Sequence, residues 1–455
     1  MLMQNDNAWS YGPNGLPMED LQVHTSPTLV LRNPVITRRR WRLRRPRPRV
    51  LLIRLLLALV ALLLALVGTG IFVWYNPMAL ATLSEPLLPA QAGAVPWNGT
   101  DPINILALGV DQRVPGERTH SDTIIVISLD PAHGTVRMAS IPRDLAVSVP
   151  GYGEMSKINE GNYLGGPRYE AYTVEHALGI PINYYIMLRF SSFQHLIDVL
   201  GGVNINVDQN INDPTYPAMV GNGYDPLVLR AGMQHMDGAT ALKYTRERHA
   251  YTTQDEARVQ HQQQLITAVK SQLISVHTLF HLPSILSALR DTFDTNMPEN
   301  LLPVVAMEMV KNSNSQHIFF NDQNGMTVEC VGGDLGADLC PTPSFWPQIH
   351  GLFADPKLAS EHAGVWVENG TALNGEAESV AKTLQTCQIN VVGTGPADNP
   401  NHAHTAVIIN SAQPPAPYTA RLLRQMFGAR LITQNMPTVS AQVVLLLGND
   451  VPQPQ

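Results

Sequence analysis

A short segment in the middle of the chain carries charged and amide side chains at a spacing that could bind a phosphate. It contains the arginines Arg246, Arg248 and Arg258, together with Asp255 and Gln262. Asp255, Arg258 and Gln262 are three and then four residues apart, so a helix would place them on one face. Arg246 and Arg248 are two residues apart, so an extended chain would point both to the same side. A loop followed by a helix could therefore direct these groups at one phosphate or pyrophosphate.

The start of that helix is predicted by a capping sequence. Thr253 and Glu256 have the Thr-x-x-Glu spacing of a capping box, which is typical of a helix N-terminus. The alternative interpretation is a solvated helix face, on which the arginines form only surface ion pairs with neighbouring carboxylates.

Three strand-like segments must position the rest of such a site. Residues 103–110, 123–130 and 135–141 are rich in aliphatic side chains, and the turn sequence DPAHGT connects the second segment to the third. If they form an antiparallel meander, the end of the first strand, the start of the second and the end of the third lie at one edge of the sheet.

Charged residues flank all three strands at that shared edge. Asp111 follows the first strand, Asp122 precedes the second, and Arg143 follows the third. Two carboxylates would suit Mg²⁺, which takes one or two of them and completes its shell with phosphate oxygens and water. Arg143 and the arginines of the first segment would neutralise the remaining phosphate charge. Without this convergence, both aspartates would be ordinary turn and cap residues.

Other kinds of active site find little support. The sequence has no GxxxxGK[ST] loop, no GxGxxG after a strand and no GxSxG nucleophile motif. The residues therefore indicate metal-assisted chemistry on a phosphate ester or anhydride.

Charge is distributed unevenly along the 455 residues. Residues 1–75 carry ten arginines, no lysine and three acidic residues, a net charge of +7, whereas the rest carries 20 basic and 34 acidic residues, a net charge of −14. The acidic body argues against nucleic acid as a partner.

An apolar segment separates these two parts. Residues 55–75 carry no charge and are long enough to span a bilayer as a helix, and the arginine-rich run 38–49 precedes them. The positive-inside rule then predicts a single-pass protein of the cytoplasmic membrane, with its N-terminus in the cytoplasm and its catalytic domain outside. A cleaved signal peptide is the alternative, which the long basic region and the length of the apolar run disfavour.

The expected organisation follows from these boundaries. Residues 1–49 form a disordered basic cytoplasmic tail, 50–75 the transmembrane helix and 76–100 a linker. The fold class is α/β: 101–355 form a catalytic domain with a central mixed or antiparallel sheet flanked by helices, and 364–450 form a small α/β domain.

The three cysteines leave one question open. Cys330 and Cys340 flank a glycine-rich segment and could pair in an oxidising exterior, which would leave Cys387 over.

Seven motifs follow one another in the larger domain. They are GVD (109–111), SDTIIVISLD (121–130), SIPRDLAVSVPG (140–151), KINEGNYLGG (157–166), FQHLIDVLGGVNINV (193–207), LRAGMQHMDGATALKYTRER (229–248) and DEARVQHQQ (255–263). With these motifs the chain resembles the LytR-CpsA-Psr family of cell-wall enzymes across 101–355. Residues 364–450 resemble the small C-terminal domain of its LytR-type members.

The resemblance implies an enzyme that attaches glycopolymers to peptidoglycan on the outer face of the cytoplasmic membrane. The donor would be a polyprenyl-pyrophosphate-linked glycopolymer whose tail lies in an apolar tunnel. Its glycan-1-phosphate would move to a peptidoglycan hydroxyl, with Mg²⁺ as the cofactor.

The resemblance also implies roles for single residues. Asp111 and Asp122 would bind the metal, and Lys157 of the KIN motif would contact the substrate. The residues implied to hold or support the pyrophosphate are Arg143, Arg246, Arg248, Asp255, Arg258 and Gln262. His120 stands where family members commonly have an arginine before the SDT motif, so one phosphate contact is weaker or is made by Arg118 instead.

Two other functions remain open. A lipid-pyrophosphate hydrolase (a pyrophosphatase) would use water as the acceptor at the same site. A non-enzymatic, membrane-bound transcriptional attenuator is the other alternative, against which the extracytoplasmic orientation and the acidic body argue.

Overall fold

A computed structural model describes residues 65–84, 95–273, 285 and 293–452, with short gaps inside these ranges. The chain divides into two compact units, 1–65 and 66–455, and the architecture below belongs to the second.

The predicted tail and most of the predicted transmembrane segment lie outside the described residues. Residues 68–73 of that segment are helical. None of the helices in the described ranges is both long and apolar enough to cross a membrane.

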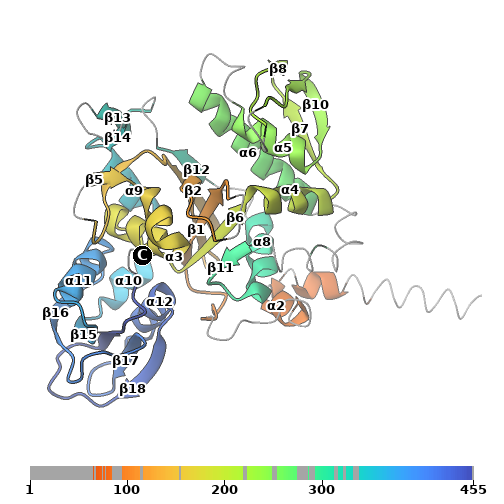
Figure 1. The fold of residues 1–455 in the computed structure, drawn as a ribbon. Helices are drawn as coiled ribbons and strands as arrows, with labels where there is room; N and C mark the ends of the chain where they lie inside the picture. The colour runs from red at the N-terminus through yellow and green to blue at the C-terminus, as the bar shows by residue number, and fades with distance from the viewer. Residues whose placement is uncertain are drawn as a thin grey trace, which may run out of the picture. The chain divides into compact units, whose positions relative to one another are not determined.

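The core of the larger domain is a mixed sheet. In the described chain its strands follow the order β11-β6-β1-β2-β3-β12 (Figure 1). The pairs β1–β2 and β2–β3 are antiparallel, which confirms the predicted meander, while β6 and β12 run parallel to β1 and β3. The strands are β1 (Ile103–Val110), β2 (Ser121–Asp130), β3 (Thr135–Ile141), β6 (Tyr184–Arg189), β11 (Phe293–Thr295) and β12 (Gln316–Phe319).

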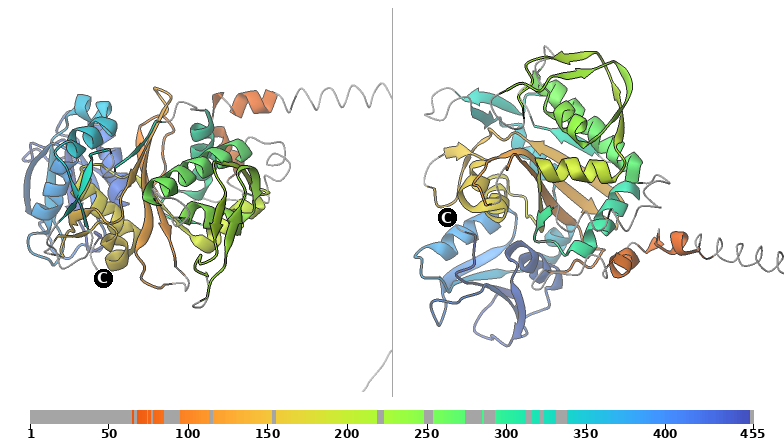
Figure 2. Two further views of the ribbon diagram at one scale, coloured as in Figure 1. Left: turned by 90° about the horizontal axis from the view of Figure 1, so that it is seen from above. Right: turned by 45° about the vertical axis from the view of Figure 1, so that its right-hand side comes forward.

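The alternation of side chains along β1 divides the interior into two apolar layers. Ile103 and Ile105 pack with one cluster, and Leu106 and Leu108 pack with the other. Helices therefore cover both faces of the sheet (Figure 2). The helices of this domain are α2 (Met78–Ser84), α3 (Glu160–Leu178), α4 (Phe190–Val199), α5 (Gly238–Arg246), α6 (Gln254–Leu273), η1 (Glu299–Leu301), α8 (Leu302–Lys311), α9 (Phe345–Leu352) and α10 (Pro356–Glu361).

Helix α3 has no counterpart among the predicted elements. Its sequence contains Gly165, Gly166 and Pro167, and both glycines leave helical geometry, so the helix is kinked there. Gly166 has a φ of 72°, which a residue without a side chain adopts freely. This interrupted sequence pattern concealed the helix.

Short hairpins complete the larger domain. Helices α4, α5 and α6 share an apolar cluster with residues of β7, β8, β9 and β10. The strands of the hairpins are β4 (Ala146–Ser148), β5 (Met155–Lys157), β7 (Val203–Val207), β8 (Ile211–Asp213), β9 (Leu227–Leu229), β10 (Gly232–Met236), β13 (Thr327–Cys330) and β14 (Asp338–Pro341).

The C-terminal part is a small α/β unit. Its described strands follow the order β16-β15-β19-β17-β18. Its apolar residues share one cluster with α3 of the larger domain, and the Arg168 guanidinium donates to the Phe427 carbonyl at 2.7 Å. The elements are β15 (Val365–Asn369), α11 (Glu376–Thr386), β16 (Val391–Pro396), β17 (Ala406–Asn410), α12 (Pro417–Phe427), β18 (Arg430–Gln434) and β19 (Val443–Leu447).

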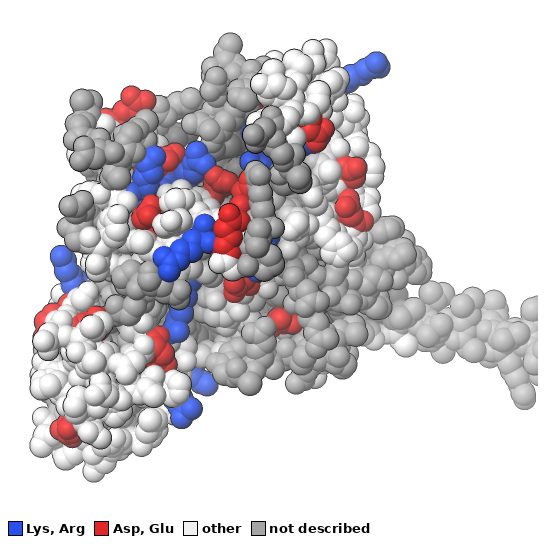
Figure 3. All heavy atoms as spheres, in the orientation of Figure 1, with Lys and Arg blue, Asp and Glu red and all other residues white. Residues whose placement is uncertain are grey.

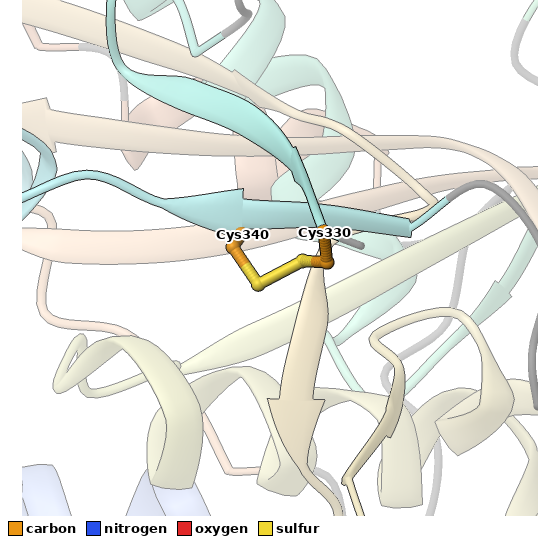
Figure 4. The surroundings of a disulfide bond; sticks show 2 residues. All are labelled: Cys330 and Cys340. Atoms are coloured by element: carbon orange, nitrogen blue, oxygen red, sulfur yellow. A yellow bond between two sulfur atoms is a disulfide. The ribbon is translucent and has the colours of Figure 1, made fainter. Parts of the chain in front are cut away.

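One disulfide joins the neighbouring strands β13 and β14. Cys330 and Cys340 form it (Figure 4), while Cys387 is a buried free thiol. The pairing that the sequence left open is therefore present.

The disulfide should contribute measurably to stability. The double variant Cys330→Ser/Cys340→Ser should lose about 3 kcal/mol, because the bond closes a short loop in the unfolded chain. Urea denaturation of the two proteins measures this loss. A reducing agent should destabilise the wild type to the same extent and leave the variant unchanged; equal sensitivity of both would contradict the role of this bond.

A buried carboxyl group makes the stability depend on pH. Glu175 of α3 is fully buried, and its Oε1 accepts a hydrogen bond from the Ile182 amide at 2.9 Å. Burial raises its pKa to about 8 from an ordinary 4.5, although that hydrogen bond and Arg168 oppose the rise. The folded state thus holds a proton that the unfolded state releases, so stability present below pH 4.5 is lost as the pH rises through 8.

Replacing Glu175 should flatten this dependence. In Glu175→Gln the buried amide does not titrate and stays uncharged at high pH. The unfolding free energy of the variant should therefore fall less between pH 5 and pH 8 than that of the wild type, by up to about 1.4 kcal/mol per pH unit. Urea denaturation at several pH values measures the slope. Glu378→Gln, an exposed carboxyl on α11, is the matched control and should keep the wild-type slope. An unchanged slope in Glu175→Gln would contradict the assignment.

Candidate active site

Two aspartates meet at one edge of the central sheet. Asp111 directly follows β1, and Asp122 is the second residue of β2. The strand pairing is regular up to Thr123 and shifts after Gly109, so Asp122 is an additional residue of β2 in a β-bulge. Bulges redirect side chains and are frequent beside active sites. The meander therefore brings both carboxylates to the edge that the sequence predicts.

Arg143 links Asp122 to a third carboxylate, that of Asp144. Its Nη1 contacts Asp122 Oδ1, and its Nε donates to Asp144 Oδ2 at 3.3 Å. Lys157, the last residue of β5, donates to Asp144 Oδ1 at 2.9 Å. Partial burial alone would lower the pKa of Arg143, but Asp144 and Asp122 raise it above its ordinary value. The result is a row of alternating charges in which the guanidinium remains protonated.

Arg246 reaches the same edge by a route that the sequence analysis did not predict. The extended chain expected around Arg246 is wrong, because the residue ends α5, a helix whose N-terminus is capped by the Asp237 side chain. From there its Nη2 lies 3.6 Å from Asp111 Oδ2, and its guanidinium lies 4.5 Å from the centre of the Phe190 ring. Arg248, its expected companion, lies outside the described residues.

The remaining predicted residues are on α6. This helix begins at Gln254, where the capping sequence predicts it. Asp255 and Arg258 lie in its first turns, but their side chains are outside the described part of the structure. Gln262 faces the cavity described next.

A cavity of about 520 Å³ extends from this charged edge along one face of the sheet. Asp122, Arg143, Arg246 and Gln262 are among its polar lining residues. Most of the wall is apolar, including Leu108, Ile125, Ile186, Leu188, Phe190, Phe193, Leu242, Leu265, Ile266 and Phe293. One end can therefore bind an anion, and the body can bind an apolar chain. Basic and acidic side chains also lie next to one another on the face seen in Figure 3.

Small residues of β1 leave room for the cavity. Ala107 lies opposite Ile125 on one side and Ile186 on the other, and all three line the cavity. Gly109, two residues further along β1, lies in the same way between Thr123 and Leu188, and these residues also line the cavity. The alternation of Ala107 and Gly109 in an otherwise bulky strand is a signal that the sequence analysis missed.

A buried polar network holds the start of β2 from behind. Glu170 of α3 is fully buried, and the Ser121 hydroxyl donates to its Oε1 at 2.5 Å. Burial raises the pKa of Glu170 to about 8, against the effect of this hydrogen bond. The amides of Asn159 and Asn162 donate to the carbonyls of Ser121 and Thr119 at 3.1 and 2.7 Å. The network fixes the backbone beside Asp122, and it was not predicted because α3 itself was not.

The donor set at the sheet edge fits Mg²⁺. Asp111 and Asp122 are partly exposed carboxylates at adjacent strand ends, and both already lie beside guanidinium groups. Hard oxygen ligands suit this ion, which keeps sites open for water and phosphate oxygens. The described residues contain no cluster of three or more His, Cys, Asp or Glu side chains that would enclose a metal on their own. A phosphate ligand would have to complete the shell.

Comparison with protein families agrees with the motifs. The model of the LytR_cpsA_psr family matches residues 83–329, more than half of the chain. The chain belongs to this family. A second model, described as LytR cell envelope-related transcriptional attenuator, matches residues 363–450.

Curated relatives in the LytR_cpsA_psr family bear the name polyisoprenyl-teichoic acid–peptidoglycan teichoic acid transferase TagU. The protein from Bacillus cereus is 32% identical over 201 residues, which cover 44% of this chain and 62% of the relative. The protein from Enterococcus faecalis is 28% identical over 245 residues, covering 53% and 77%. The chain thus spans somewhat less than two thirds of the Bacillus cereus protein.

Solved structures are similar to part of this chain at low sequence identity. The crystal structure of B. subtilis TagV is 23% identical, with a TM-score of 0.46, and the similarity covers 56% of this chain and 96% of that chain. TagT bound to LIIa-WTA is 22% identical, with a TM-score of 0.42, covering 56% and 92%.

The site should bind pyrophosphate through Arg143. Arg143→Ala should weaken the binding of inorganic pyrophosphate with Mg²⁺ by about 10- to 100-fold, because a charged hydrogen bond contributes about 1.5–3 kcal/mol. Isothermal titration calorimetry measures the affinity. Thermal stability should change little, because the Arg143 and Asp122 side chains are 32% and 33% exposed. The exposed Arg230→Ala is the matched control, and an equal loss in both variants would contradict a specific site.

Proposed function

We propose that this chain transfers a glycan-1-phosphate from a polyprenyl-pyrophosphate-linked glycopolymer to a peptidoglycan hydroxyl. The observation that carries the proposal is the cavity, whose charged end and apolar body match the two ends of such a donor. The family assignment and the names of the TagU relatives point to the same reaction class.

The donor is expected to lie along the sheet. Its polyprenyl tail would occupy the cavity beside Ala107 and Gly109 and displace water from the apolar walls. Its pyrophosphate would lie at the sheet edge, within reach of Arg143 and Arg246. Lys157 lies further from the expected pyrophosphate position than Arg143 does, because Asp144 lies between the two cations.

The reaction requires positioning and charge stabilisation. The acceptor oxygen forms a bond to the phosphorus that carries the glycan, the bond from that phosphorus to the bridging oxygen breaks, and polyprenyl phosphate leaves. The acceptor proton passes to a carboxylate, for which Asp111 and Asp122 are the candidates. Arg143 and Arg246 stabilise the charge that develops on the phosphoryl oxygens. Bound Mg²⁺ would neutralise further phosphate charge at the two aspartates.

The proposed reaction requires a domain outside the cytoplasmic membrane. The basic run and the apolar segment of residues 1–75 support a membrane anchor with a cytoplasmic N-terminus. The disulfide between Cys330 and Cys340 supports an oxidising location for the larger domain.

Product analysis tests the proposal. The detergent-solubilised full chain, incubated with a polyprenyl-pyrophosphate glycan, peptidoglycan fragments and Mg²⁺, should form a phosphodiester-linked conjugate detectable by mass spectrometry. Arg246→Ala should lower the rate by about 100-fold or more, because it removes a group aimed at developing charge. A chelator should abolish the reaction, and Arg230→Ala should retain it.

The same experiment separates the alternatives. Free glycan phosphate without a conjugate would identify a lipid-pyrophosphate hydrolase. The absence of any turnover of the donor would contradict an enzymatic role.

A further inference from the structure

An aromatic pair lies beside the predicted reaction centre and has no role in the proposal above. The rings of His120 and Tyr163 are stacked, with centroids 4.8 Å apart and planes 6° from parallel. The His120 side chain is 47% exposed and Tyr163 is 39% exposed. Neither residue lines the cavity. The pair is therefore a surface feature, separate from the space assigned to the lipid tail.

The pair is held in place on both sides. His120 Nε2 lies 2.9 Å from Glu160 Oε2, at the start of α3. The carbonyls of the two residues that flank His120, Thr119 and Ser121, accept the hydrogen bonds from Asn162 and Asn159. Fixed exposed rings are suited to receive a ligand, because little conformational entropy is lost on binding.

The chemistry of the pair favours a sugar ring over a phosphate. The imidazole Nε2 of His120 already faces the Glu160 carboxylate. What remains exposed is aromatic surface, next to the Tyr163 hydroxyl, which has no hydrogen-bond partner among the described residues, and the Glu160 carboxylate. A hexose offers a C–H face to such rings and hydroxyls to such polar groups.

The position of the pair matches that of an acceptor. His120 directly precedes β2 and Asp122 is the second residue of that strand, so only Ser121 separates them along the chain. Beyond Tyr163, α3 breaks at Gly165 and Gly166, and the space where a Gly166 side chain would stand is empty within 4 Å. Tyr163 lies on α3, whereas the cavity for the donor tail is lined by residues of α4, α5 and α6 together with the sheet.

We propose that His120 and Tyr163 form a subsite that stacks against a sugar ring of the acceptor glycan and positions its hydroxyl beside Asp122. This inference deepens the proposed function and rests on it. It assigns the acceptor side of a reaction for which the cavity describes only the donor side.

Steady-state kinetics of the full chain test the subsite. The KM for peptidoglycan fragments and the KM for the polyprenyl-pyrophosphate glycan are measured separately, each with the other substrate in excess. Tyr163→Leu keeps an apolar side chain without an aromatic face and should raise the acceptor KM about 3- to 10-fold. The donor KM should stay unchanged. Tyr163→Phe, the matched control, retains the ring and should keep an acceptor KM closer to that of the wild type.

Other results of this experiment would contradict either the stacking subsite or the proposed function. An unchanged acceptor KM in Tyr163→Leu, or an equal rise in Leu and Phe variants, would overturn the stacking subsite. A rise in the donor KM alone would show that the rings contact the donor glycan. If misfolding of Tyr163→Leu raised the acceptor KM, its thermal unfolding midpoint and its kcat would fall as well. In that case Tyr163→Trp, which restores an aromatic ring, should restore the acceptor KM, and a failure to do so would overturn the subsite. No turnover in the wild type would instead contradict the proposed function itself.

Discussion

Two carboxylates at the ends of neighbouring strands repel each other, and the structure places a guanidinium group beside each of them. Arg143 contacts Asp122, and Arg246 lies 3.6 Å from Asp111. Partly exposed ion pairs contribute only about 0–1 kcal/mol to stability, so these pairs do little for the fold. Their arrangement suits the ligand that we propose, a metal-bound pyrophosphate, which needs both signs of charge. The bulge at Asp122, the turn after β3 and the end of α5 all serve this arrangement.

The fold supports the site from two directions. On one face of the sheet, Ala107 and Gly109 leave the space that larger side chains would fill, so an apolar cavity reaches the charged edge. On the other face, α3 holds the start of β2 through Glu170, Asn159 and Asn162. These hydrogen bonds tie the backbone and hydroxyl of Ser121 and the carbonyl of Thr119 to α3, and breaking one of them would leave a buried polar group without a partner.

Helix α3 also links the site to the C-terminal unit. Arg168, a few residues after the kink, donates to the carbonyl of Phe427, and the His176 ring lies 2.8 Å from the Thr383 hydroxyl. The two parts share one apolar cluster, so α3 packs against the sheet and the C-terminal unit together. The helix is thus a structural element of the site, of the aromatic pair and of the contact between the two domains.

The sequence by itself determined the features that depend on local pattern: the meander, the edge that Asp111, Asp122 and Arg143 share, the start of α6 and the family motifs. Alternating side chains, turn residues and capping residues act over a few positions, so they can be recognised without a structure. Only the tertiary structure decided the contact of Arg246 with Asp111, the burial of Glu170 against Ser121 and the shape of the cavity. These depend on how elements far apart in the chain pack, which no short-range pattern encodes. The extended chain expected at Arg246 is wrong for this reason: the spacing of two residues suggested it, but Arg246 is the last residue of a helix that Asp237 caps.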